Sequence, residues 1–220
     1  MKRHYRFLLK IIAGAGLSLL SAQDPFVLDS AGTGSITQSI ANSIQIADAN
    51  NDGYNDIILS GYDSTRFGLF IDVMLGSGDG TLSQGYQTYF VTYSDTIAEY
   101  LGGIGNISLA DVNLDGSIDL YINGSARSKL LFNTSSGYFN ESSWLQNMPV
   151  SYSNGKWGDV NMDGRPDLFL MGVEEPSGDY IINELFINTG NDLEKDPSTI
   201  FPSLFTGSSA WGDYDNDGDP

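Results

Sequence analysis

The stretch Asp111-Val-Asn-Leu-Asp-Gly-Ser-Ile-Asp119 carries oxygen-bearing side chains at its first, third, fifth and ninth positions and glycine at its sixth. The pattern recurs as Asp48-Ala-Asn-Asn-Asp-Gly-Tyr-Asn-Asp56 and as Asp159-Val-Asn-Met-Asp-Gly-Arg-Pro-Asp167. A fourth copy begins as Asp213-Tyr-Asp-Asn-Asp-Gly-Asp-Pro220. Charged groups crowded onto one turn repel one another by roughly 4 kcal/mol per close pair at an effective dielectric near 20. We therefore expect a cation among them.

The ligands that these loops offer are hard oxygen atoms, which suit Ca²⁺ and argue against Zn²⁺ or copper. We expect about one calcium ion per loop, with backbone carbonyls of Tyr54, Ser117 and Arg165 adding to the first three sites. Metal-free turns closed by Asp and Asn side chains are the alternative. The predicted side-chain ligands are Asp48, Asn50, Asp52, Asp56, Asp111, Asn113, Asp115, Asp119, Asp159, Asn161, Asp163, Asp167, Asp213, Asp215 and Asp217.

A helix-based calcium loop does not fit these repeats. An EF-hand shares the first six positions but needs a bidentate glutamate at the twelfth. The twelfth positions here are Leu59, Ile122 and Leu170, which carry no ligand oxygen. No helical periodicity flanks the loops, so a dockerin-type loop is excluded as well.

The spacing of the loops predicts an all-β repeat architecture. The loops begin 63, 48 and 54 residues apart, which fits propeller blades better than shorter solenoid repeats. Short apolar runs that lack polar alternation indicate strands buried on both faces. The expected first strands are 44–47, 107–110, 156–158 and 210–212; the second are 57–61, 120–124 and 168–172; the third are 69–75, 129–132 and 184–187; the fourth begin near residues 81, 138 and 193.

The repeated unit, an aspartate loop after a small residue and before an apolar strand ending in glycine, resembles the FG-GAP/VCBS repeat. It is similar to the calcium-bearing blades of the integrin α-subunit β-propeller. The resemblance covers about residues 44–220, with Trp157-Gly158 and Trp211-Gly212 nearest to the degenerate Phe-Gly signature. It implies a seven-bladed ring with calcium in the loop between the first and second strands of each blade, and partner binding on the opposite face.

Three whole units and the start of a fourth cannot close such a ring. We therefore expect an integrin-α-like β-propeller of four-stranded antiparallel blades that is incomplete in this chain. The expected domains are a secretory signal peptide at 1–23, a lead-in at 24–43, and propeller repeats at 44–220 that are truncated at the C-terminus.

The first residues have the pattern of a cleaved signal peptide, because a basic start precedes an apolar run and a small-residue exit. A retained N-terminal anchor is the alternative. We expect the protein to be secreted or displayed at the cell surface, without a membrane span in the mature part. Loss of this segment removes four cationic residues and no acid, and changes the formal net charge from −18 to −22. Such acidity argues against nucleic acid as a partner.

The mature part has no cysteine and no histidine, since the only histidine is His4. This composition excludes disulfides, a Ser-His-Asp triad, a cysteine nucleophile and the usual zinc sites within these residues. We expect no enzymatic activity from them. An enzyme that degrades polysaccharide, of which this propeller would be a catalytic or non-catalytic part, is the alternative, because carboxylates and tyrosines can act as acids and bases. A surface scaffold without a specific ligand is a third.

The predicted function is an adhesion or binding module for an extracellular protein or glycan, with structural Ca²⁺. On the face opposite the loops, Arg66 and Arg127 are the candidate ligand-binding residues, since arginine grips carboxylates. Exposed arginines that only offset local acid are the alternative. The tyrosines between Leu82 and Gly103 suggest either a sugar-stacking platform or a long fourth strand.

Overall fold

The computed structural model describes residues 40–63, 68–91, 106–122, 128–145, 150–174, 181–204, 207–215 and 218. These residues form twelve β-strands and no helix. The predicted all-β class is therefore confirmed. It follows that no helix in the described ranges is long and apolar enough to cross a membrane. The predicted signal peptide and most of the lead-in lie outside the described residues.

The strands form three four-stranded sheets, in which each strand pairs antiparallel with the next in sequence. The first sheet contains β1 (Ile40–Ala47), β2 (Asp56–Asp63), β3 (Gly68–Gly76) and β4 (Leu82–Val91). The second contains β5 (Ile107–Ala110), β6 (Asp119–Ile122), β7 (Lys129–Asn133) and β8 (Phe139–Glu141). The third contains β9 (Val150–Gly158), β10 (Asp167–Glu174), β11 (Ile181–Asn188) and β12 (Leu193–Lys195).

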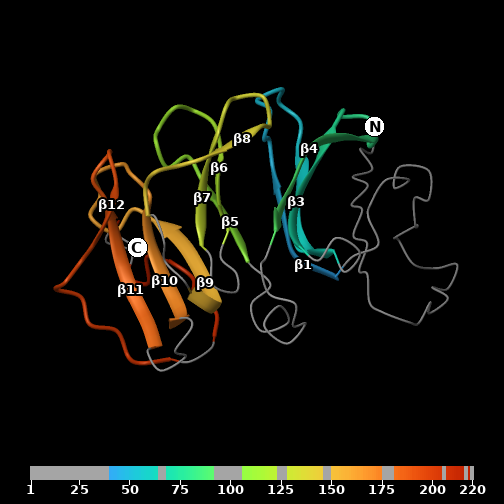
Figure 1. Cartoon of the computed structure of the whole chain (residues 1–220). Coiled ribbons are helices and arrows are strands. Elements are labelled where there is room, and N and C mark those ends of the chain that lie inside the picture. The colour runs from blue at the N-terminus through green and yellow to red at the C-terminus, as the bar shows by residue number, and fades with distance from the viewer. Residues whose placement is uncertain are drawn as a thin grey trace, which may run out of the picture.

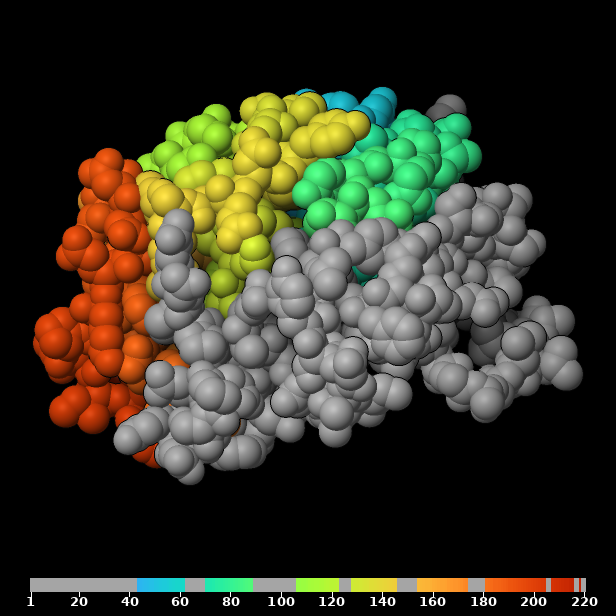
Figure 2. All heavy atoms as spheres, in the orientation of Figure 1, coloured from blue at the N-terminus to red at the C-terminus, as the bar shows by residue number. Residues whose placement is uncertain are grey.

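The three sheets stand side by side like the blades of a fan (Figure 1), and each aspartate loop joins the first strand of a sheet to the second. The first strands adjoin one another in the order β1, β5, β9. The surface shows the same succession, with the second sheet between the first and the third (Figure 2). These are successive blades of a β-propeller, and three of them do not close a ring.

The apolar core lies between the sheets, which is why the second strands are apolar on both faces. All four residues of β6 are buried. One cluster joins the first and second sheets through Ala49, Ile58, Ile71, Val73, Ile107, Leu120, Ile122, Leu131 and Phe139. The other joins the second and third through Val112, Tyr121, Leu130, Leu145, Leu168, Leu170, Ile182, Phe186 and Leu193.

A close approach between two blades depends on Gly155 in β9. A Cβ atom at this position would lie 2.8 Å from the Tyr121 ring, which is 1 % exposed and packs edge-on against Trp157. Real Cβ atoms do not come so near, so any larger residue at Gly155 would push the two sheets apart.

The described residues of the fourth repeat form no strand. Residues 210–212 were predicted to be a first strand, but they have no regular structure, and that prediction is wrong. A strand needs a hydrogen-bonded neighbour, and none of the described residues pairs with this segment. Trp211 nevertheless packs on the third sheet, where its Nε1 donates to the Lys156 carbonyl at 3.2 Å and its ring lies edge-on to Phe169.

The extra length of the first repeat is taken up in part by β4, which has ten residues. Tyr86 in this strand packs against Tyr138 and Phe139 of the second sheet, with ring centroids 5.7 Å apart in both pairs. Its hydroxyl donates to the Phe139 carbonyl at 3.3 Å. Tyr86 therefore belongs to an interface between blades, as the long-strand interpretation requires. Residues 92–105 lie outside the described residues.

Candidate metal-binding loops

The aspartate at the first position of each loop organises the backbone of that loop. Its two oxygens accept the N–H groups of the fifth and sixth residues. The distances are 3.0 and 2.8 Å at Asp48, 3.0 and 2.9 Å at Asp111, and 3.0 and 2.8 Å at Asp159. Asp213 repeats the second of these bonds, to Gly218 at 3.0 Å. The loops are therefore folded alike by their first side chain.

The third and fifth positions are joined to one another in the same way in all three complete loops. The asparagine Oδ1 accepts the N–H of the fifth residue, and its Nδ2 donates to the carboxylate of that residue. The Nδ2 to Oδ2 distances are 2.9 Å for Asn50–Asp52, 3.0 Å for Asn113–Asp115 and 3.1 Å for Asn161–Asp163. The fifth side chain is exposed in each case, so these polar groups lie at the surface.

The aspartate at the ninth position has a different environment, because it is completely buried in each loop. Asp119 accepts the Val112 N–H at 2.9 Å with one oxygen and the Asn133 N–H at 2.9 Å with the other. Asp56 and Asp167 make the equivalent pairs of bonds. Burial raises the pKa of Asp119 to about 6, although these N–H donors oppose the shift. Burial likewise raises the pKa of Asp56 and of Asp167.

The backbone turns sharply at the fourth and sixth positions. Glycine occupies the sixth, with φ of +87°, +87° and +85° at Gly53, Gly116 and Gly164. The fourth residue is also left-handed, with φ of 59° at Asn51, 56° at Leu114 and 59° at Met162. Asparagine adopts this region readily, whereas leucine and methionine do so at a cost. Because Leu114 and Met162 are also exposed, the loop geometry and not core packing determines their conformation.

A buried asparagine links the first loop, and another the second loop, to the sheet that follows it. Asn133, at the end of β7, donates from Nδ2 to the Ala49 carbonyl in the first loop at 2.7 Å. The Ala49 N–H in turn donates to Asp56 at 2.8 Å. Asn133 also donates its backbone N–H to Asp119, so this one residue joins the first loop to the second.

The same link joins the second and third sheets. Asn188, at the end of β11, donates to the Val112 carbonyl at 2.8 Å and to the Pro166 carbonyl at 3.1 Å. A continuous chain of hydrogen bonds thus runs from Asp167 through Asn188 and Asn133 to Asp56. In the first sheet the equivalent residue is Gly76, whose N–H donates to Asp56 and which has no side chain to reach further. We refer to Asn133 and Asn188 as the inter-blade asparagines.

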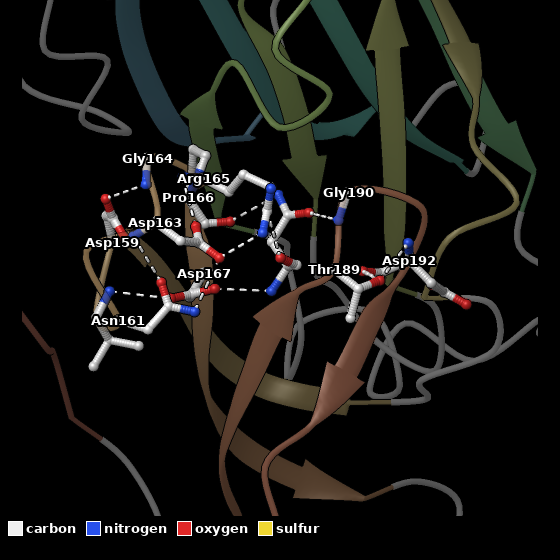
Figure 3. A network of polar contacts seen from close by, with 12 residues as sticks. Asp159, Asn161, Asp163, Gly164, Arg165, Pro166, Asp167, Thr189, Gly190 and Asp192 are labelled. Carbon is white, nitrogen blue, oxygen red and sulfur yellow. Dashed lines mark hydrogen bonds and ion pairs between the residues drawn. The ribbon is translucent and has the colours of Figure 1, made fainter.

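The third loop alone among the three complete loops contains a cationic side chain. Arg165, at the seventh position, lies beside Asp163, with Nη2 and Oδ2 2.7 Å apart (Figure 3). Its Nε donates to the Asn188 carbonyl at 2.9 Å. Burial would raise the pKa of Asp163, but the Arg165 N–H, the Asn161 amide and the guanidinium charge together lower it.

The predicted ligands are thus brought together loop by loop but are not gathered around one point. Within the described ranges, no three His, Cys, Asp or Glu side chains are grouped as a metal site would group them. The ninth carboxylate is occupied by backbone donors, and the fifth faces an asparagine amide. The donor set is nonetheless all hard oxygen, which fits Ca²⁺. Asp217, Arg66 and Arg127 lie outside the described residues.

Several structurally important polar residues were not predicted. Each inter-blade asparagine ends the third strand of its sheet and is followed by threonine, and this repeated Asn-Thr pair was the available signal. Asp72 is 1 % exposed in the middle of β3, where Gln84 Nε2 donates to its carboxylate. Burial raises the pKa of Asp72, against bonds from Gln84 and Gln87. Its only signal was an acid within an apolar strand.

Comparison with protein families identifies the repeat. The model of the FG-GAP-like repeat matches residues 111–170 and again residues 159–220. The chain belongs to the FG-GAP-like repeat family. Both matches begin at the first aspartate of a loop; the first extends past the third loop, and the second ends within the fourth. The first FG-GAP-type loop, at 48–56, precedes the matched region but has the same hydrogen bonds. No curated protein matches the chain.

Proposed function

We propose that this FG-GAP repeat chain is an exported β-propeller module whose loops bind Ca²⁺ for structural purposes and whose opposite face binds a protein or glycan. The observation that supports calcium most strongly is the shared hydrogen bonding of the loops. In three loops the first and fifth carboxylates are positioned by backbone N–H groups, while their remaining lone pairs stay near the surface.

The charge of the loops supports the same proposal. Each complete loop carries three aspartates, and among the described residues the ion pairs place a cation beside only one of these nine carboxylates, that of Asp163. A divalent ion would neutralise most of the remaining charge. To reach it, the side chains at the first, third and fifth positions would turn toward a common centre, which their partial exposure permits.

The ion would be a structural element rather than a catalytic one. The first, third, fifth and ninth side chains would hold it, and it would join the exposed part of each loop to the buried aspartate that contacts the next strand. The basic and apolar start of the chain supports export. The proposal of a protein or glycan partner rests on the family resemblance and on Arg66 and Arg127.

Removal of calcium tests this function. We expect the melting temperature to fall when EDTA is added and to recover when excess Ca²⁺ is restored. Each site filled at about 100 times its dissociation constant contributes roughly 2.7 kcal/mol to the free energy of unfolding. Mg²⁺ at the same concentration is the control, because it demands a tighter octahedral shell. Equal melting temperatures in EDTA and in Ca²⁺ would contradict the proposal.

A further inference from the structure

The three complete loops differ at the seventh position, which faces the turn between the third and fourth strands of its own sheet. Tyr54 lies over Gly78, where an added Cβ would be 2.1 Å from the tyrosine ring. Ser117 shares a hydrogen bond of 2.8 Å with Ser135. Arg165 lies over Gly190, with its Cδ 3.7 Å from the place of an added Cβ. The position is thus equivalent in the three loops, but only the third places a positive charge there.

Arg165 is held at both ends of its guanidinium group. Nε donates to the Asn188 carbonyl at the end of β11, and Nη2 donates to Asp163 Oδ2 at 2.7 Å. The stem of the side chain packs against Gly190. The guanidinium group is planar and rigid, so its bond to the Asn188 carbonyl already orients it for the Asp163 carboxylate. The charge therefore stays beside the loop in the folded protein.

The fifth carboxylate consequently has one more donor in the third loop than in the other two. In the first two loops, Oδ1 of the fifth aspartate accepts the N–H of the seventh residue, and Oδ2 accepts the asparagine amide. Asp163 makes both of these bonds, and its Oδ2 also accepts the Arg165 guanidinium. One of the two carboxylate oxygens that Asp163 could offer to a cation therefore already contacts a cationic group.

We infer that Arg165 is a built-in counter-cation that offsets one of the three aspartates of the third loop and lowers the affinity of this loop for Ca²⁺ below that of the first and second loops. This inference rests on the proposed function. A bound Ca²⁺ must displace the guanidinium from Asp163 or be repelled by it. As the Ca²⁺ concentration rises, the first and second loops then bind their ions before the third loop does. The third loop keeps its shape at Ca²⁺ concentrations that leave it without an ion.

The test is a Ca²⁺ titration of the full chain followed by the amide NMR signals of Gly53, Gly116 and Gly164. Each of these amides donates to the first aspartate of its own loop, so each reports on one loop. In the unsubstituted protein we expect Gly164 to reach half-saturation at roughly three- to tenfold higher free Ca²⁺ than the other two. Arg165→Gln keeps the stem and removes the charge, and should bring the Gly164 midpoint down to theirs.

A matched variant places the charge in the first loop. Tyr54 is 49 % exposed, so Tyr54→Arg is accommodated, and we expect it to raise the Gly53 midpoint by a similar factor without moving that of Gly116. Arg165→Gln should also lower the melting temperature in EDTA. If Arg165 is a counter-cation, Arg165→Gln raises the Ca²⁺ affinity of the third loop and lowers the melting temperature without calcium. If Arg165 only supports the fold, the same substitution lowers both the Ca²⁺ affinity and the melting temperature.

The outcomes distinguish the two proposals. If the three glycines titrate but neither variant moves its own midpoint, the role of Arg165 is wrong and the calcium function stands. If no glycine signal responds to Ca²⁺, the proposed function is wrong, and the inference about Arg165 is wrong with it.

Discussion

Two kinds of buried aspartate stand out at the scale of single residues. The ninth aspartates of the loops accept backbone N–H groups from two segments and so join a loop to the end of a strand. Asp72 instead faces glutamine side chains between β3 and β4. Backbone donors favour the charged form of the first kind and tie it to the fold, but burial outweighs these bonds and raises the pKa of each. Asp72 is held by side-chain amides that join no loop to a strand, so its charge is mainly a cost.

Burial raises the pKa of all four of these aspartates, so all of them contribute to the pH dependence of stability, and Asp72 is the one that can be replaced without cutting a bond between a loop and a strand. Because burial raises its pKa in the folded state, the folded protein binds the proton more tightly than the unfolded chain. Its favourable contribution is complete below the unfolded pKa, near 4, and is lost as the pH rises through the folded pKa. Asp72→Asn should therefore raise the free energy of unfolding by roughly 1 kcal/mol at pH 7 and by much less at pH 4.

Urea denaturation in EDTA at both pH values measures this difference. The amides of Gln84 and Gln87 can rotate to accept from the new side-chain amide at position 72, so the variant is expected to fold. Glu194→Ala, which removes an exposed acid that takes part in none of the ion pairs among the described residues, is the control and should change stability by less than about 0.5 kcal/mol at either pH. A variant that is less stable at pH 7 than at pH 4, relative to the original protein, would contradict the assignment.

At the scale of elements, the inter-blade asparagines determine how one sheet meets the next. Each reaches from the end of a third strand to a carbonyl in the loop of the preceding sheet. Both are almost completely buried, at 4 % for Asn133 and 0 % for Asn188. A buried amide that donates to two carbonyls leaves both unsatisfied when it is removed. These bonds therefore fix the position of one loop relative to the next.

Substitution of Asn188 by alanine tests whether these bonds between blades stabilise the fold. We expect Asn188→Ala to lower the free energy of unfolding by about 2 kcal/mol, because the Val112 and Pro166 carbonyls lose their donor. The measurement is urea denaturation in EDTA. Asn140→Ala, at an exposed position in β8, is the matched control and should cost less than about 0.5 kcal/mol. Equal losses in the two variants would contradict a link between blades.

The sequence predicted the parts of the fold that depend on local pattern. Apolar runs on both sides of each loop became the paired strands, since such runs bury both faces between sheets. Contacts between distant segments could not be predicted in this way. The bond from Asn133 to Ala49 joins residues 84 apart, and nothing near either residue indicates the other. The strand expected at 210–212 failed for a related reason, because pairing depends on a partner elsewhere.

The site was predicted at the level of residue type but not of role. The loop pattern predicted sets of four oxygen-bearing side chains, and the structure places each complete set within one loop, which leaves their role as metal ligands a prediction. It did not distinguish the buried ninth aspartate, which contacts backbone groups, from the half-buried first and the exposed fifth ones. Arg165 was considered only for its carbonyl, whereas its side chain pairs with Asp163. Such differences arise from burial and from the neighbouring sheet, which a repeated motif does not specify.

At the scale of the whole molecule, the blades form an array in which each sheet depends on its neighbours. The two apolar clusters lie between sheets and not within them. The chain has no cysteine, so no disulfide supports this arrangement. A formal net charge of −18 makes repulsion among the loops a further cost. Bound divalent ions would relieve that repulsion where the acids are concentrated.

We propose that the aspartate loops of this FG-GAP array hold calcium, and the number of ions bound per chain tests this proposal. Equilibrium dialysis measures this number, at a free Ca²⁺ concentration of about 10 mM, which exceeds the dissociation constants typical of extracellular calcium modules. We predict at least three ions per chain, one for each complete loop. A value of one ion or fewer would contradict the claim, and the loops would then be turns closed by their own hydrogen bonds.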